Sequence, residues 1–291
     1  MIHTIKNDLL TISVSEQGAE LQSILDANGT QYLWQGDPKY WSDRALNIFP
    51  YVARLTDGQY ELDGQRYAMQ IHGFAMYSWF TLTEKTDDRL VFTLKSSAET
   101  YNIYPRNLIF QVIYTLHQNI LDTTYLVKNL DTKKMYFAVG GHPGFNVPLS
   151  KDKDFEDYRL RFAHSCDPRR VGFTKACFID GTDTAYPLEG RNILPLRHEM
   201  FDEDAIVLKD MAREVTLEAA DGPALTVRYP DFPYLGIWHR PHTDAPYVCI
   251  EPWSSLPSTQ DKIAVLKEQK DLLQLDPGGT YTNSWQIIIH S

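Results

Sequence analysis

A histidine and a glutamate in this sequence stand where acid–base chemistry is possible. His142 lies in Gly140-Gly141-His142-Pro143-Gly144-Phe145-Asn146, directly after a predicted strand over 135–139. The glycines and the proline predict a bent functional loop with the imidazole at the bend. Glu251 ends the predicted strand Tyr247-Val248-Cys249-Ile250 among apolar neighbours. Desolvation there would raise its pKa from about 4.3 toward a value useful for a general base. The alternative for Glu251 is a strand-end carboxylate paired with an arginine.

Two earlier segments place polar residues beside apolar ones. Arg54 ends the run Asn47-Ile48-Phe49-Pro50-Tyr51-Val52-Ala53, and its guanidinium fork would suit the hydroxyls of a sugar. An ordinary surface arginine is the alternative. His72 precedes a glycine in Ile71-His72-Gly73-Phe74, which predicts an imidazole held in a tight turn. Its alternative is a histidine with a purely structural role in a turn or in the core.

The sequence is rich in aromatic residues, with six tryptophans and seventeen tyrosines. Aromatic side chains are favoured in β-sheet cores and at their rims, which accounts for many of them. Pyranose rings also stack their apolar C–H faces on aromatic rings, so some tryptophans are candidates for a sugar platform. These candidates are Trp34, Trp41, Trp238 and Trp253.

The sequence predicts neither a metal site nor an organic cofactor. His239 and His242 have a His-x-x-His spacing, but Pro241 lies between them, so they do not lie one helical turn apart. No cysteine or carboxylate lies at a helpful ligand spacing from them. No glycine-rich phosphate loop, dinucleotide fingerprint or Gly-x-Ser-x-Gly elbow is present, which argues against nucleotide binding and a serine nucleophile.

Charge and cysteine content narrow the class of protein. The net charge is −10, which argues against a nucleic-acid partner and an anionic membrane surface. The three cysteines have no paired short spacing and predict reduced thiols. We see no signal-peptide pattern at the start and no apolar run near the ~20 residues that span a bilayer. We therefore expect a cytoplasmic protein.

The elements that must position these residues are predicted to be β-hairpins. Alternating segments flank polar two-residue turns, which are strong hairpin signals when they contain Asn-Gly or Asp-Gly. The turns are at Asn28-Gly29, Asp63-Gly64, Asp87-Asp88, Gln118-Asn119 and Asp221-Gly222. The segment 31–34 is expected to follow the first turn as a strand, and 284–289 to close the fold. The one helix candidate is 261–273. This pattern predicts an all-β antiparallel sandwich or barrel forming one domain over 1–291.

The order of these motifs resembles the aldose 1-epimerase (galactose mutarotase-like) family. The resemblance rests on Arg54, His72-Gly73, the histidine at 142 after a strand, and Ile250-Glu251 near the end, and it covers essentially the whole chain. Gly-His-Pro-Gly-Phe and Ile-Glu-Pro-Trp are similar to the LacX branch of that family. The resemblance implies a large antiparallel β-supersandwich with a carbohydrate cleft across one sheet.

The resemblance also implies roles for individual residues. His142 matches the family's general acid and Glu251 its general base, while His72 would orient the substrate and Arg54 would contact it. The family's aspartate ahead of a hydrophobic strand is matched by the segment 201–208, in which Asp204 is the choice. Better-known members carry Asn-His-x-Tyr-Phe at the second histidine, so Gly-His-Pro-Gly-Phe implies different substrate contacts here.

The function expected from these features is interconversion of the α and β anomers of a hexose or hexose phosphate, without a cofactor, by a monomer or homodimer. Two rivals remain: a carbohydrate-binding protein without turnover, and a glycoside hydrolase or lyase. Hydrolysis would require two carboxylates about 5–10 Å apart, such as Glu251 facing Asp204. Arginines that could bind a phosphate, or simply pair at the surface, are Arg44, Arg54, Arg169, Arg170 and Arg240.

Overall fold

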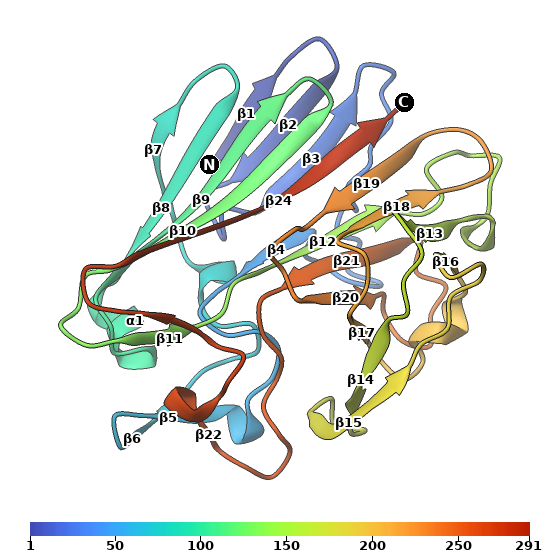
Figure 1. The fold of residues 1–291 in the computed structure, drawn as a ribbon. Coiled ribbons are helices and arrows are strands. Elements are labelled where there is room, and N and C mark those ends of the chain that lie inside the picture. Colours follow the sequence, from blue (N-terminus) through green and yellow to red (C-terminus); the bar gives the residue numbers. More distant parts are fainter.

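A computed structural model describes all residues from Met1 to Ser291. Its main feature is a pair of large antiparallel sheets (Figure 1). One sheet has nine strands in the order β16 (Ile193–Pro195), β13 (Arg159–Phe162), β18 (Glu214–Glu218), β19 (Ala224–Arg228), β24 (Thr280–His290), β10 (Ile120–Asn129), β9 (Leu108–His117), β8 (Arg89–Lys95) and β7 (Thr81–Lys85).

The other large sheet carries the candidate site. Its seven strands run in the order β15 (Ile179–Ala185), β14 (Arg169–Phe173), β17 (Ile206–Lys209), β20 (Tyr234–Trp238), β21 (Tyr247–Trp253), β12 (Gly140–Asn146) and β4 (Ala45–Ile48). Every residue of β21 is buried, which explains why all of its residues except Glu251 are apolar or aromatic. The predicted antiparallel β-sandwich is thereby confirmed.

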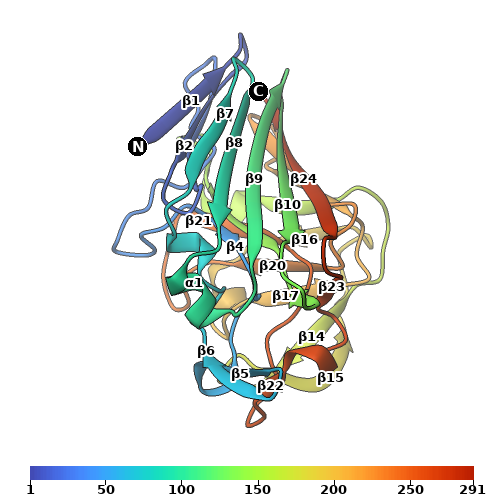
Figure 2. The ribbon, with the colours of Figure 1, turned by 90° about the vertical axis from the view of Figure 1, so that its left-hand side faces the viewer.

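Smaller elements complete the fold. Three strands form an antiparallel sheet: β1 (Ile2–Lys6), β2 (Leu10–Ser15) and β3 (Leu21–Asp26). A second small sheet contains β22 (Ala264–Val265), β5 (Gln59–Leu62) and β6 (Gln65–Ala68), and β11 (Met135–Phe137) pairs with β23 (Leu273–Leu275). Single 3-10 turns lie at Thr56–Gly58, Ala75–Tyr77, Phe155–Asp157, His198–Phe201 and Leu266–Glu268. Figure 2 shows both termini at one end of the molecule and β5, β6 and β22 at the other.

A buried polar network links the two large sheets behind the candidate site. The Tyr125 hydroxyl, from β10, lies 3.0 Å from both Asn47 Oδ1 on β4 and the Gly140 carbonyl oxygen on β12. The Trp285 indole N–H, from β24, donates to the same hydroxyl at 3.2 Å. Because buried polar groups are costly unless they are paired, this network favours one relative placement of β4 and β12 over the far sheet.

The hairpin predictions are largely confirmed. Asp63 and Gly64 both have positive φ, 54° and 76°, between β5 and β6, as a tight two-residue turn requires. The turns at 87–88, 118–119 and 221–222 join β7 to β8, β9 to β10, and β18 to β19. The closing strand begins earlier than predicted, at Thr280.

Two element predictions are wrong, and one element was not predicted. The segment 261–273 is not a helix, because its backbone is used by β22, which pairs in parallel with β5, and by a short 3-10 turn. The segment 31–34 forms only isolated bridges, including Leu33 to Phe145. The single α-helix, α1 (Ala98–Ile103), was missed, although Ser97 and Thr100 form a capping box at its start.

No helix in the structure has the length and apolar character needed to cross a membrane. The three cysteines are unpaired.

Candidate active site

The pairing of β12 with β21 places the imidazole beside the carboxylate. Gly144 lies opposite Cys249 and Gly140 opposite Trp253, so the same antiparallel register sets His142 opposite Glu251. Side chains two residues apart on a strand share a face. His142 therefore belongs to a central strand, and its predicted place at the bend of a loop is wrong. The predicted strand over 135–139 is also shorter, because β11 ends at Phe137 and the chain then joins the seven-stranded sheet.

The glycines around His142 make room for tryptophans and do not mark a bent loop. A Cβ at Gly144 would lie 3.0 Å from Trp41 Cζ3, and one at Gly140 would lie 3.1 Å from Trp253 Cδ1. On the opposite face, a Cβ at Gly141 would lie 2.7 Å from Trp285 Cζ2. The absence of side chains thus lets aromatic rings pack closely against both faces of β12.

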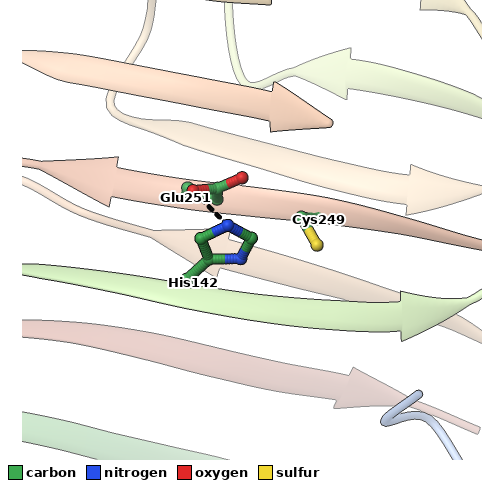
Figure 3. A group of neighbouring side chains, drawn as sticks. All are labelled: His142, Cys249 and Glu251. Atoms are coloured by element: carbon green, nitrogen blue, oxygen red, sulfur yellow. Dashed lines mark ion pairs between the residues drawn. The ribbon is translucent and has the colours of Figure 1, made fainter. Parts of the chain in front are cut away.

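His142 and Glu251 form a buried, incompletely bonded pair (Figure 3). His142 Nε2 lies 3.2 Å from Glu251 Oε2, but the contact is not aligned as a hydrogen bond. His142 is 8% exposed and Glu251 is 1% exposed. His142 Nδ1 and Glu251 Oε2 have no hydrogen-bond partner. Buried polar atoms are usually bonded, so these atoms are available to a ligand.

Burial sets the protonation of this pair. It lowers the pKa of the His142 imidazole to about 4 and raises the pKa of the Glu251 carboxyl well above its usual range. The nearby Trp253 indole opposes the rise in the pKa of Glu251, although its N–H has no aligned acceptor, and the negative charge of Asp204 adds to the rise. Burial thus favours the uncharged form of both groups.

His72 is held next to this pair as a neutral donor. Its Nδ1 accepts the Ala53 N–H at 3.2 Å, which leaves the ring proton on Nε2. Its ring centroid lies 5.4 Å from that of His142, and burial lowers its pKa well below the usual value. The turn is tight, since a Cβ at Gly73, where φ is 80°, would lie 2.2 Å from the Phe49 carbonyl oxygen.

A cleft of about 550 Å³ opens over the pair, and all six residues selected from the sequence line it: Arg54, His72, His142, Asp204, Trp238 and Glu251. Arg54 is exposed and has no ion pair. Asp204 Oδ2 accepts a hydrogen bond from the Cys177 thiol at 3.0 Å. The rings of Trp41 and Trp238 meet at 86°, and their centroids lie 4.9 Å and 5.7 Å from that of His142.

The structure also separates residues that the sequence had grouped. Trp41 and Trp253 line the cleft, whereas Trp34 stacks on Tyr247 beneath it. Of the five arginines, Arg54 and Arg240 line the cleft and Arg170 lines an adjoining cavity. Arg44 and Arg169 line neither cavity, so they are not placed to bind a phosphate in the cleft. Sequence reasoning missed the lining residues Tyr77, Phe173 and Cys177, which carry no local motif.

Asp204 and Glu251 both line the cleft, and the negative charge of Asp204 raises the pKa of Glu251. The group in direct contact with Glu251 is the His142 imidazole, at 3.2 Å, which is the acid–base pairing expected from the sequence.

The His239 and His242 side chains do not come together as metal ligands. His239 is fully buried, with its Nδ1 donating to the Arg240 carbonyl at 2.8 Å and its Nε2 lying 3.0 Å from His198 Nδ1. His242 is exposed and contacts Asp202 at 3.2 Å.

The buried His239 should make stability depend on acid pH. Burial lowers its pKa to about 4, whereas the unfolded chain binds this proton near 6.5. Its contribution to stability is therefore complete above about 6.5 and is lost as the pH falls toward 4. We expect His239 alone to lower the free energy of unfolding by about 2 kcal/mol between pH 7 and pH 5. Urea unfolding at both pH values should show this pH dependence weakened in His239→Asn and unchanged in His242→Asn. An equal change in the free energy of unfolding between the two pH values in wild type and His239→Asn would contradict the prediction.

Gly236 on β20 leaves space for the glutamate on the neighbouring strand. It pairs with Glu251, and a Cβ at this position would lie 3.2 Å from both Glu251 Cβ and Trp253 Cζ2. We expect Gly236→Ala to shift the carboxylate by a few tenths of an ångström and to lower kcat of a reaction in which Glu251 transfers a proton by about 10-fold, since misplacements near 1 Å can cost about 100-fold. Steady-state kinetics should show the loss in kcat, with ligand affinity by calorimetry nearly unchanged. An unaltered kcat would show that the spacing is not critical.

Comparisons with known proteins agree with this fold. A family model described as aldose 1-epimerase matches residues 1–282. The protein LacX, chromosomal, of Lactococcus lactis subsp. lactis is 32% identical over 295 aligned residues, covering 98% of each chain.

Solved structures give the same result. A galactose mutarotase related enzyme from Lactobacillus acidophilus superposes with a TM-score of 0.95 at 31% identity, covering 100% of this chain and 98% of that one. A galactose mutarotase-like protein from Lactobacillus casei gives 0.93 at 31% identity, with full coverage of both chains. The resemblance inferred from the sequence is confirmed.

Proposed function

This chain belongs to the aldose 1-epimerase family, and on that premise we propose that it interconverts the α and β anomers of a hexose by acid–base opening and reclosure of the ring. The observation that carries the proposal is the His142–Glu251 pair, buried at the floor of a cleft with unbonded polar atoms. Aromatic rings of Trp41 and Trp238 beside the pair supply apolar surfaces suited to a pyranose.

Ring opening requires two proton transfers. Glu251 as carboxylate removes the proton from the C1 hydroxyl, the C1–O5 bond breaks as C1=O forms, and His142 as imidazolium protonates O5. Rotation about C1–C2 presents the other face of the aldehyde, and the reverse transfers close the ring. Each positioned acid or base contributes about 10²–10⁴-fold.

The directions of the two pKa shifts fit this scheme. In its neutral form the pair holds the single proton that the reaction needs, on Glu251. Its transfer to His142 across 3.2 Å creates the reactive state without any change in net charge. Sugar hydroxyls that bond to the carboxylate would favour this transfer, because hydrogen bonds to the ionised form lower a carboxyl pKa.

The other cleft residues have binding roles in this proposal. His72 donates from Nε2, Asp204 accepts a hydroxyl, and Arg54 supplies a guanidinium fork from the rim. Arg54 and Arg240, both at the cleft, would also tolerate a phosphorylated hexose.

Polarimetry tests the proposal. Freshly dissolved α-D-glucose, α-D-galactose and α-D-glucose 6-phosphate should each be compared with and without protein, and faster relaxation to the equilibrium rotation is expected for at least one. Calorimetric sugar binding with no acceleration would instead support the binding protein without turnover.

A further inference from the structure

Cys249 is a buried thiol that the proposed reaction does not use. It lies two residues before Glu251 on β21, so both side chains leave the same face of the strand (Figure 3). It is fully buried and has no hydrogen-bond partner. Trp41 and Trp238 pack over its apolar surroundings.

The thiol completes a set of three possible metal ligands. One donor atom each from His142, Cys249 and Glu251 lies within 4.8 Å of the other two. Sulfur, imidazole nitrogen and carboxylate oxygen are the ligands that Zn²⁺ binds, at about 2.0–2.3 Å. A tetrahedral ion with these bond lengths needs its ligands about 3.3–3.6 Å apart. The 3.2 Å between His142 Nε2 and Glu251 Oε2 is close to one such edge, and the thiol would have to move by about 1 Å.

A second observation points to a ligand at this place. Glu251 Oε2 is buried without a hydrogen-bond partner, and Glu251 and His142 line the cleft, from which water could fill a fourth coordination position. A thiolate and a carboxylate would also neutralise the two charges of the ion, which a buried site requires.

We propose that His142, Cys249 and Glu251 form a binding site for a thiophilic divalent cation such as Zn²⁺, and that the bound ion excludes the sugar. Binding releases the thiol proton and the proton shared by the acid–base pair. The ion then occupies the groups that would hold the C1 hydroxyl and the ring oxygen. His142 Nδ1 has no acceptor, and the lack of such a supporting bond should weaken the affinity by about 10–100-fold relative to fully supported sites.

Cobalt provides a readout that does not depend on turnover. Co²⁺ added to the purified full-length protein should produce an absorption band from thiolate-to-cobalt charge transfer, and Zn²⁺ should remove the band by displacing Co²⁺. The band should be absent in Cys249→Ser. It should persist in Cys166→Ser and Cys177→Ser, the latter being the matched control because Cys177 also lines the cleft. Mg²⁺, which prefers oxygen ligands, should not compete.

A wild-type protein without this band at millimolar Co²⁺ would overturn the proposal. A band retained in Cys249→Ser would overturn it as well. Cys249→Ala, checked by thermal unfolding, covers the case in which serine disturbs the apolar surroundings. Because the band is measured without a sugar, its presence or absence is independent of whether the protein is an epimerase. If polarimetry does detect turnover, Zn²⁺ should inhibit wild type at concentrations that leave Cys249→Ala active.

Discussion

Glu251→Gln is expected to lower kcat for anomer exchange by about 10²–10⁴-fold, the usual contribution of one positioned acid–base group. The amide keeps the size and shape of the carboxyl group but cannot accept the C1 hydroxyl proton. The amide fills the space of the carboxyl group, so no water can take the place of the base there. Polarimetric relaxation at saturating sugar measures the effect.

Folding and sugar binding are the controls for Glu251→Gln. Circular dichroism and thermal unfolding should match wild type, because glutamine at a buried site removes no volume and avoids an ionisable group. Calorimetry should still detect sugar. A folded variant that keeps the wild-type relaxation rate would rule out Glu251 as the base.

His142→Asn is the second large effect, again about 10²–10⁴-fold in kcat. Asparagine retains a hydrogen-bonding group beside Glu251 but cannot carry a proton to the ring oxygen. Because the two residues exchange a single proton, the double variant should lose little more than either single variant. Additive losses in the double variant would argue against a joint role.

The pH profile of wild-type kcat/KM provides an independent check on this pair. We expect acid to stop anomer exchange when a second proton reaches the pair, which requires protonation of His142, whose pKa is about 4. We expect alkali to stop it when the shared proton is lost from Glu251, whose pKa is raised well above its usual range. We therefore expect activity to extend well below pH 6.5 and to fall near 4. A fall in kcat/KM near pH 6.5 on the acid side would indicate a histidine that is not desolvated.

The sequence predicted the hairpins well because each is specified locally. Asp63-Gly64 adopts positive φ at both positions and alternation on either side fixes the strands. The six residues selected for the site all line one cleft, although the roles given to them depended on a resemblance to a family. Nothing local to positions 142 and 251 specifies that they face each other.

The segment at 140–146 was misread for a physical reason. Glycine serves both sharp bends and close packing, and the sequence cannot distinguish these without the neighbouring strands. Here the deciding neighbours are Trp41, Trp253 and Trp285, which come from distant parts of the chain. The prediction of a helix over 261–273 was wrong for a similar reason, since pairing with β5 overrides the weak apolar periodicity of this segment.

His142 and Glu251, the proposed acid and base, lie opposite each other on adjacent strands of one sheet, apart from the residues proposed to bind the sugar. Backbone hydrogen bonds of β12 and β21 hold the reactive pair, whereas Arg54, Asp204 and Arg240 approach from connecting segments at the rim. Exchanging those segments should therefore retune which sugars are accepted while the proton-transfer distance stays constant. Protein engineers could therefore vary the segments that carry Arg54, Asp204 and Arg240 while they keep the His142–Glu251 pair unchanged.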